Sequence, residues 1–300
     1  MDAVRLDNVV KSFGAVRAVD GLSARVPCGC VYGFLGPNGA GKTTTLRMMM
    51  DIIASDEGRV EILGRDASQT ARERVGYMPE ERGLYARMSV RSVLRYIASI
   101  KGLGAAEAKR RADAWLERVD LAGWAGKKVR DLSRGMQQRL QFAATAINDP
   151  ELLILDEPFS GLDPVNLDVL KDILLSLREA GTTVIFSTHM MDQAEQLCDA
   201  ILLINDGRVV LDGPLDAIRR GSRSETILLE VDGAADAVAA MPDVRSVTPV
   251  GRRLEVHLAD GTDRRRWLTG LLGRVEVLSF EQRTPSLHEI FVQRVRGDDA

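Results

Sequence analysis

The chain has 300 residues, of which 45% are hydrophobic and 28% are charged, and this is an ordinary globular composition. A net charge of -3 gives no support for nucleic acid as a partner, and no apolar run approaches the roughly 20 residues of a spanning helix. The N-terminus has no signal-peptide pattern, so we expect a cytoplasmic protein. The sparse set Cys28, Cys30 and Cys198 favours incidental thiols over a metal site.

Two alternating segments open the chain. Residues 4–10 and 22–26 alternate in polarity, and they predict an antiparallel pair of strands. Phe13 lies in the turn between them, ahead of a glycine-rich loop. Such an aromatic residue could pack as a core or staple residue, or it could offer a platform to an adenine ring. The residues leave both interpretations open.

The glycine-rich loop fits the phosphate-binding pattern G-x-x-x-x-G-K-[ST]. It consists of Gly36, Pro37, Asn38, Gly39, Ala40, Gly41, Lys42 and Thr43. A short apolar run around Val31 predicts a buried strand before it, and residues 44–53 have helical spacing after it. Glycines allow close backbone approach, Lys42 supplies charge for the β- and γ-phosphates, and Thr43 offers a hydroxyl to Mg²⁺. Chance would produce this match in roughly one chain in a hundred of this length, and the flanking elements favour a functional loop.

A helical region follows two short strand candidates at residues 59–63 and 75–78. From about residue 85 to residue 148 the pattern is helical, which predicts a helical lobe inserted into an α/β domain. Residues 131–138 open the last helix of this lobe, with Ser133 in the N-cap position. Spacing alone does not separate this segment from an ordinary capped helix.

Ionisable side chains follow two buried strands. The apolar run Leu152–Leu155 ends in Asp156 and Glu157, and the run at residues 182–186 leads to His189. Ligands of α/β sheets bind at the carboxyl ends of the strands. Asp156 could therefore hold Mg²⁺, and Glu157 could orient and polarise a water molecule. A lone histidine is usually structural, but the position of His189 favours contact with the γ-phosphate.

A second unit is predicted to begin near Gly221, so we expect domains at residues 1–220 and 221–300. Its strand and helix patterns follow the order βαββαβ, which suggests a small ferredoxin-like sandwich with a final helix at residues 285–295. It contains no catalytic constellation.

Residues 1 to about 220 closely resemble the nucleotide-binding subunit of ATP-binding cassette (ABC) transporters. The residues that match its motifs are the loop Gly36–Thr43, Leu132–Met136 at the signature, Leu152–Asp156 at Walker B, Ser160–Asp163 at the D-loop and His189 at the switch histidine. The segment Thr284–Phe291 looks like part of the C-terminal extension of bacterial drug- or sodium-exporter-type ATPases. The resemblance implies an α/β P-loop NTPase core with an antiparallel β subdomain and the helical lobe, followed by the small α+β domain.

The same resemblance implies roles for particular residues. Glu157, His189 and Lys42 would be catalytic, and Thr43, Asp156 and Glu80 would face Mg²⁺. The residues implied to bind ATP are Phe13, Gly36, Pro37, Asn38, Gly39, Ala40, Gly41, Lys42, Thr43, Thr44, Ser133 and Gly135. Two positions depart from the family pattern: Glu80 replaces the Q-loop glutamine, and the signature contains Ser-Arg-Gly-Met where Ser-Gly-Gly-Gln is common.

The resemblance also implies an assembly. Two such subunits would pack head to tail, as a homodimer or with a homologous subunit, with ATP between the P-loop of one and Ser133 of the other. A separate permease would place them on the cytoplasmic face of the membrane, and the extension favours export. The alternatives are a soluble ABC ATPase acting on ribosomes or DNA, and a nucleotide-binding regulator without turnover.

Glu80 follows a predicted strand and precedes the helical lobe, so it lies at a hinge. A carboxylate can still bind Mg²⁺ but adds negative charge beside Asp156 and Glu157. Our hypothesis is that Glu80 senses Mg²⁺ and couples the site to the permease, and that Mg²⁺, Arg82 or Arg134 balances its charge. The alternative is a solvated loop acid that never reaches the site.

Overall fold

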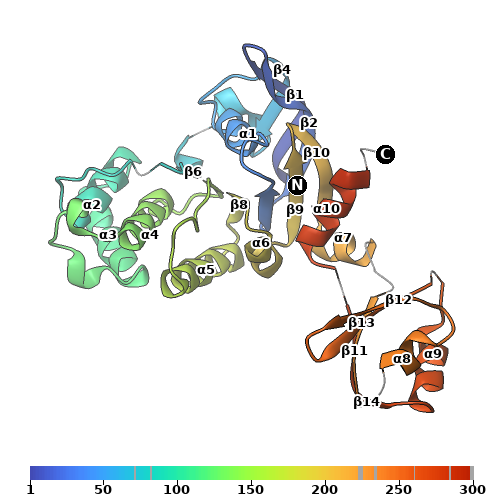
Figure 1. The fold of residues 1–300 in the computed structure, drawn as a ribbon. Coiled ribbons are helices and arrows are strands. Elements are labelled where there is room, and N and C mark those ends of the chain that lie inside the picture. The colour runs from blue at the N-terminus through green and yellow to red at the C-terminus, as the bar shows by residue number, and fades with distance from the viewer. Residues whose placement is uncertain are drawn as a thin grey trace. The chain divides into compact units, whose positions relative to one another are not determined.

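The computed structural model describes residues 1–70, 72–81, 83–221, 226–232, 235–259, 261–283 and 285–297 (Figure 1). The chain divides into two compact units, Met1–Leu215 and Asp216–Ala300. The break lies in the helix α7 (Leu215–Gly221), close to the predicted boundary at residue 220, and that boundary stays a prediction. No helix in the described ranges is long and apolar enough to cross a membrane.

A six-stranded sheet forms the centre of the first unit. Its strands are β3 (Val31–Leu35), β6 (Val75–Met78), β7 (Leu152–Leu155), β8 (Thr183–Thr188), β9 (Ala200–Asn205) and β10 (Arg208–Pro214). They lie in the order β10-β9-β3-β8-β7-β6, all parallel except β10. Every residue of β3, β7 and β8 is buried, as expected for parallel strands that are covered on both faces.

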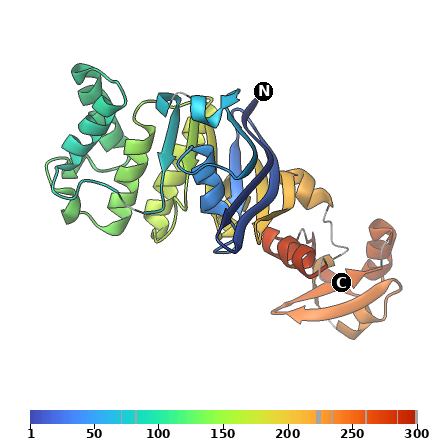
Figure 2. The ribbon, with the colours of Figure 1, turned by 90° about the horizontal axis from the view of Figure 1, so that it is seen from above.

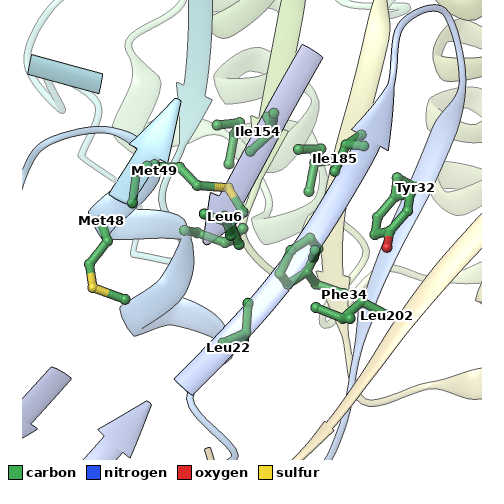
Figure 3. Close-up of a cluster of buried hydrophobic side chains, with 14 of the residues drawn as sticks. Leu6, Leu22, Tyr32, Phe34, Met48, Met49, Ile154, Ile185 and Leu202 are labelled. Carbon is green, nitrogen blue, oxygen red and sulfur yellow. The ribbon is translucent and has the colours of Figure 1, made fainter. Parts of the chain in front are cut away.

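A second, antiparallel sheet covers this one. Its strands are β1 (Asp2–Phe13), β2 (Val16–Pro27), β4 (Glu57–Ile62) and β5 (Arg65–Asp66), in the order β2-β1-β4-β5. The predicted pairing of residues 4–10 with 22–26 is confirmed. Leu6 and Leu22 of this sheet meet Phe34 of β3 and Met49 of the helix after the P-loop in one buried cluster (Figure 3). The cluster fixes that helix against both sheets.

Helices form the remainder of the first unit. The predicted helical lobe is present as α2 (Val90–Ile100), α3 (Ala105–Arg118) and α4 (Arg134–Ala146), which Figure 1 shows grouped beside the sheet. Trp115 of α3 packs against Phe142 of α4 with 6.4 Å between ring centroids. The helices α5 (Pro164–Glu179) and α6 (Met191–Leu197) follow β7 and β8.

The second unit has the predicted βαββαβ order (Figure 1), and Figure 2 shows the same ribbon from above. Its elements are β11 (Thr226–Asp232), α8 (Ala235–Ala239), β12 (Val244–Val250), β13 (Arg253–Leu258), α9 (Arg264–Leu272), β14 (Glu276–Gln282) and α10 (Leu287–Gly297). The antiparallel order β12-β13-β11-β14 confirms the ferredoxin-like fold. Val238 of α8 and Trp267 of α9 share one core with the sheet. Residues 222–225, just after the predicted domain boundary, and Thr284, the first residue of the predicted extension segment, lie outside the described residues.

Candidate active site at the P-loop

The phosphate-binding loop connects β3 to α1 (Lys42–Met49). Gly41 caps the helix with a left-handed φ of 103°, and Gly36 has a φ of 151°. A Cβ on Gly36 would lie 2.2 Å from the carbonyl oxygen of Ile204, and one on Gly41 would lie 2.4 Å from that of Ala18. These two glycines are thus required by the protein's own backbone packing, whereas the sequence had suggested close approach to phosphate as the reason.

The helix after the loop is shorter than the predicted segment 44–53. It begins at Lys42 and ends at Met49, so the prediction was wrong at both ends. Asp51 adopts a left-handed φ of 52°, and the N–H of Ile52 donates to the carbonyl of Arg47 at 2.9 Å. This reversal ends the helix, although the apolar spacing of the sequence continues past it.

A hollow of about 390 Å³ opens over the N-terminus of α1. It is lined by Ala18, Asn38, Gly39, Gly41, Lys42, Thr43, Thr44, Glu80, Glu157, Ser160 and His189. These residues come from the P-loop, from β2, and from the carboxyl ends of three parallel strands. The structure thus brings the predicted P-loop, the predicted acids and the predicted histidine to one place.

Lys42 and His189 meet on Glu157 inside this hollow. The Nζ of Lys42 donates to the carbonyls of Gly36 at 2.8 Å and Pro37 at 3.1 Å, and lies 3.7 Å from Oε1 of Glu157. The Nδ1 of His189 lies 3.1 Å from the same oxygen. Burial lowers the pKa of Lys42, and the neighbouring carboxylates of Glu157 and Asp156 partly offset that effect.

Asp156 is held by two hydroxyl groups and is almost fully buried. Its Oδ1 accepts hydrogen bonds from Ser187 Oγ at 2.6 Å and from Thr43 Oγ1 at 3.2 Å. Its Oδ2 is buried and has no hydrogen-bond partner among the described residues. An unpaired buried carboxylate oxygen is costly, so this atom is suited to a cation.

Ser187 is a site residue that the sequence analysis missed. Besides donating to Asp156, its Oγ accepts from the backbone N–H of Glu157 at 2.9 Å. Glu157 has a left-handed φ of 48°, which is uncommon for a residue with a side chain, and this bond helps to hold it there. The only signal in the sequence was a hydroxyl two positions before His189.

Some predicted ligand residues lie away from the hollow. Ser133 caps α4, where its Oγ accepts from the N–H of Met136 at 3.3 Å, and neither it nor Gly135 lines the hollow. Phe13 lies at the end of β1 with 52% of its surface exposed, which excludes the core alternative. Pro37 and Ala40 belong to the loop but not to the wall.

Comparison with known proteins identifies the family. A family model described as ABC transporter matches residues 19–160, and one described as the C-terminal domain of DrrA1-3-like ATP-binding proteins matches residues 213–295. The ABC transporter ATP-binding protein YhaQ of Bacillus subtilis (strain 168) is 38% identical over 97% of each chain. This chain belongs to the ATP-binding proteins of ABC transporters. The predicted resemblance, including the exporter-type extension, is confirmed, and the chain is an ATP-binding ABC ATPase.

Other relatives of this ABC ATPase carry more specific names. The daunorubicin resistance protein DrrA3 of Streptomyces coeruleorubidus is 38% identical and covers 99% of this chain and 96% of its own. The Nod factor export protein I of Rhizobium sp. (strain N33) is 34% identical, over 97% and 96%. A solved structure of a dimeric, post-hydrolysis cassette bound to ADP and Pi is 25% identical, with a TM-score of 0.65 over 71% of this chain and 98% of that one.

Glu80 lies in the wall of the hollow of this ABC ATPase but is itself exposed. The ammonium group of Lys42 shares the wall with it, and the charge of Glu80 is one of those that oppose the lowering of the Lys42 pKa by burial. Arg134 does not line the hollow, and Arg82 lies outside the described residues. The Mg²⁺ hypothesis and the solvated-acid alternative for Glu80 therefore both stay open.

A larger hollow, of about 580 Å³, lies in the C-terminal unit between α9 and the turn at Met241–Asp243. It contains Arg266 and Arg274, and among its described lining residues there is no buried lysine and no buried carboxylate. We therefore take the smaller hollow as the candidate site for phosphate in this ABC ATPase.

Proposed function

We propose that this ATPase subunit binds Mg-ATP at the P-loop and, as one half of a head-to-tail dimer, drives export through a separate permease. The observation that carries the proposal is the convergence of Lys42, Glu157 and His189 on one point above the P-loop, beside an unpaired carboxylate oxygen of Asp156. The N-terminus of α1 presents free N–H groups and a positive dipole there, which suits a triphosphate.

The residues of the hollow divide into distinct roles in this proposal. The backbone of residues 36–44 surrounds the phosphates, and Lys42 moves its ammonium group from the loop carbonyls to phosphate oxygens. Glu157 orients and polarises the attacking water, and His189 holds Glu157 and reaches the γ-phosphate. Lys42 and Glu157 are both buried, so little solvent weakens their fields.

A magnesium ion fits the donors around Asp156. Thr43 and Asp156 offer hard oxygen atoms, and the free Oδ2 of Asp156 has no other described partner. Glu80, on the same wall, is a further oxygen donor. The ion would neutralise charge that develops on the phosphates.

The dimer is supported by a helix N-terminus that is suited to phosphate but lies away from the P-loop hollow of its own chain. Ser133 and Gly135 lie at the start of α4, a 13-residue helix, and outside the hollow of their own chain. Their N–H and hydroxyl groups would donate hydrogen bonds to ATP bound by a facing subunit. The related cassette that was solved as a dimer with ADP and Pi supports the formation of a dimer. Phe13, exposed at the end of β1, would stack on the adenine.

Export is supported by the relatives and by the C-terminal unit. Two relatives across nearly the whole chain are named for daunorubicin resistance and Nod factor export, and the C-terminal family model belongs to DrrA-type proteins. The soluble, non-transport alternative and the regulator without turnover have no comparable support, because the nearly full-length relatives are ATP-binding proteins of transporters.

The test is the variant Glu157→Gln, which keeps the size of the side chain but removes the charge that polarises water. We expect ATP binding to persist and Mg-ATP hydrolysis to fall by about 100-fold or more. Lys42→Ala should instead weaken ATP binding. A purified Glu157→Gln protein that releases phosphate at the wild-type rate would exclude Glu157 as the catalytic carboxylate.

A further inference from the structure

Two glutamines of α4 donate hydrogen bonds to backbone carbonyls in the segments that follow two strands of the sheet. Gln141 Nε2 donates to the carbonyl of Pro79 at 2.9 Å and to that of Glu81 at 3.3 Å. Gln138 Nε2 donates to the carbonyl of Pro158 at 3.0 Å. Positions three apart lie on the same face of a helix, so both amides reach from one side of α4.

The carbonyls that these amides bind are next to the two carboxylates of the hollow. Pro79 and Glu81 flank Glu80, and Pro158 follows Glu157. The strands that lead to these segments, β6 and β7, are paired neighbours that end side by side, with Met78 opposite Leu155. One helix therefore holds both acidic segments at the edge of the ATP site.

These contacts are buried and specific. Gln138 is 2% exposed and Gln141 is 5% exposed, so neither can exchange its partner for water. Only the donor end of Gln141 is used, because its Oε1 has no hydrogen-bond partner among the described residues. The amide of a glutamine donates a hydrogen bond and adds no charge beside Glu80 and Glu157. A lysine or a glutamate in place of Gln138 or Gln141 would add a charge there.

We propose that Gln138 and Gln141 are positioning residues that tie α4 to the segments of Glu157 and Glu80, so that ATP held at the start of α4 by the facing subunit sets the geometry of both carboxylates. The proposal rests on the roles given to Glu80, Glu157 and Ser133 under the proposed function. It predicts that one rigid helix, 13 residues long, links the two ATP sites of the dimer.

The first measurement compares three full-length variants of buried polar residues of α4. Gln141→Met and Gln138→Met keep the length of the side chain and remove the donor. Thr145→Val is the control, because Thr145 Oγ1 donates to the carbonyl of Gln141 within the helix at 2.9 Å and to no acidic segment. We expect Gln141→Met and Gln138→Met to hydrolyse Mg-ATP about 10- to 100-fold more slowly, with ATP affinity within about twofold of the wild-type value. A rate loss in Thr145→Val as large as that in Gln141→Met overturns the proposal.

The second measurement is a double-mutant cycle. If Gln141 acts through Glu80, Gln141→Met should slow hydrolysis no further in a Glu80→Ala background. Rate losses that multiply mean that Gln141 acts on general stability, and the proposal fails.

Amide hydrogen exchange gives a readout that does not depend on turnover. Residues 79–81 should exchange faster in Gln141→Met, and residues 157–159 faster in Gln138→Met, whereas Thr145→Val should change neither segment. Unchanged exchange in the first two variants overturns the positioning role. This result is independent of the proposed function, which fails separately if Glu157→Gln retains wild-type turnover.

Discussion

At the scale of single residues, the site depends on acids that the protein holds in costly positions. Asp156 is 1% exposed, and Glu157, at 9%, has a left-handed backbone. A buried carboxylate and a left-handed backbone at a residue other than glycine are both energetically costly, so neighbouring groups must stabilise them. Ser187 is the residue in contact with both, since it donates to Asp156 and accepts from the N–H of Glu157.

Removal of the Ser187 hydroxyl should therefore affect stability and turnover together. Ser187→Ala leaves a buried carboxylate and a buried N–H short of a partner, and we expect the free energy of unfolding to fall by about 1–3 kcal/mol. Mg-ATP hydrolysis should fall as well, because Asp156 and Glu157 lose their common support. Denaturant unfolding and phosphate release measure the two effects.

The matched control for Ser187→Ala lies in the same strand. Thr183 Oγ1 accepts from the N–H of Gly29 at 2.9 Å, at the far end of β8 from the acids. Thr183→Val should cost comparable stability and leave turnover unchanged. An equal loss of turnover in both variants would mean that Ser187 matters only for folding.

Glu80 provides the second prediction at this scale. Glu80 lines the same hollow as Lys42 and Glu157. Glu80→Gln keeps an oxygen donor and should have a mild effect, whereas Glu80→Lys brings a second ammonium group and should reduce hydrolysis by about tenfold or more, equivalent to about 1.4 kcal/mol. In Glu80→Lys, the Mg²⁺ concentration that gives a half-maximal rate of hydrolysis should also rise. If neither substitution changes the rate of hydrolysis or its Mg²⁺ dependence, Glu80 is a solvated loop acid.

At the scale of secondary-structure elements, α4 is capped by Ser133 and also carries the two amides that hold the segments of Glu80 and Glu157. Its N-cap Ser133 has a direct comparison in α2, where Ser89 Oγ accepts from the N–H of Ser92 at 3.2 Å. Both serines cap a helix of the lobe, so their removal should cost similar stability, about 1 kcal/mol each. Only Ser133 is assigned to ATP.

The two N-cap serines, Ser133 and Ser89, allow a test of ATP-dependent dimer formation. Light scattering of Glu157→Gln with saturating Mg-ATP should give the mass of a dimer. Adding Ser133→Ala should raise the ATP concentration for half-dimerisation by about tenfold, about 1.4 kcal/mol, and adding Ser89→Ala should not. A strict monomer under saturating ATP, with the cap residues intact, contradicts the head-to-tail assembly.

At the scale of the whole molecule, the chain consists of two units with separate cores. The first core packs the two sheets around α1, and the second packs α8 and α9 on the ferredoxin-like sheet. Every described residue that lines the P-loop hollow belongs to the first unit. The C-terminal unit is thus expected to regulate or to dock and to take no part in the chemistry.

A chain that ends at Gly221 should fold and bind ATP. It retains α7, in which Leu215 is buried and donates its N–H to the carbonyl of Asp199 at 3.0 Å. Circular dichroism reports folding, and calorimetric titration reports the affinity for ATP, which should stay within about threefold of the full-length value. A folded, truncated protein that fails to bind ATP would show that the functional boundary is drawn wrongly.

The sequence by itself determined the family, the P-loop, the acids at strand ends and the βαββαβ order of the second unit. These features depend on local spacing, because a short buried strand, a glycine loop or a strand terminus is encoded by consecutive residues. The parallel sheet then brought Lys42, Glu157 and His189 together, since the carboxyl ends of neighbouring strands share one edge.

Only the tertiary structure decided which partners complete the site. Ser187 meets Asp156 across 31 residues of sequence, and Gln141 meets Pro79 across 62. Gly36 and Gly41 are confined by carbonyls of distant strands, and Asp51 ends α1 while the apolar spacing continues. A periodic pattern reports which face of an element is buried, but not which atom of another element lies against it, because that depends on how the whole chain packs.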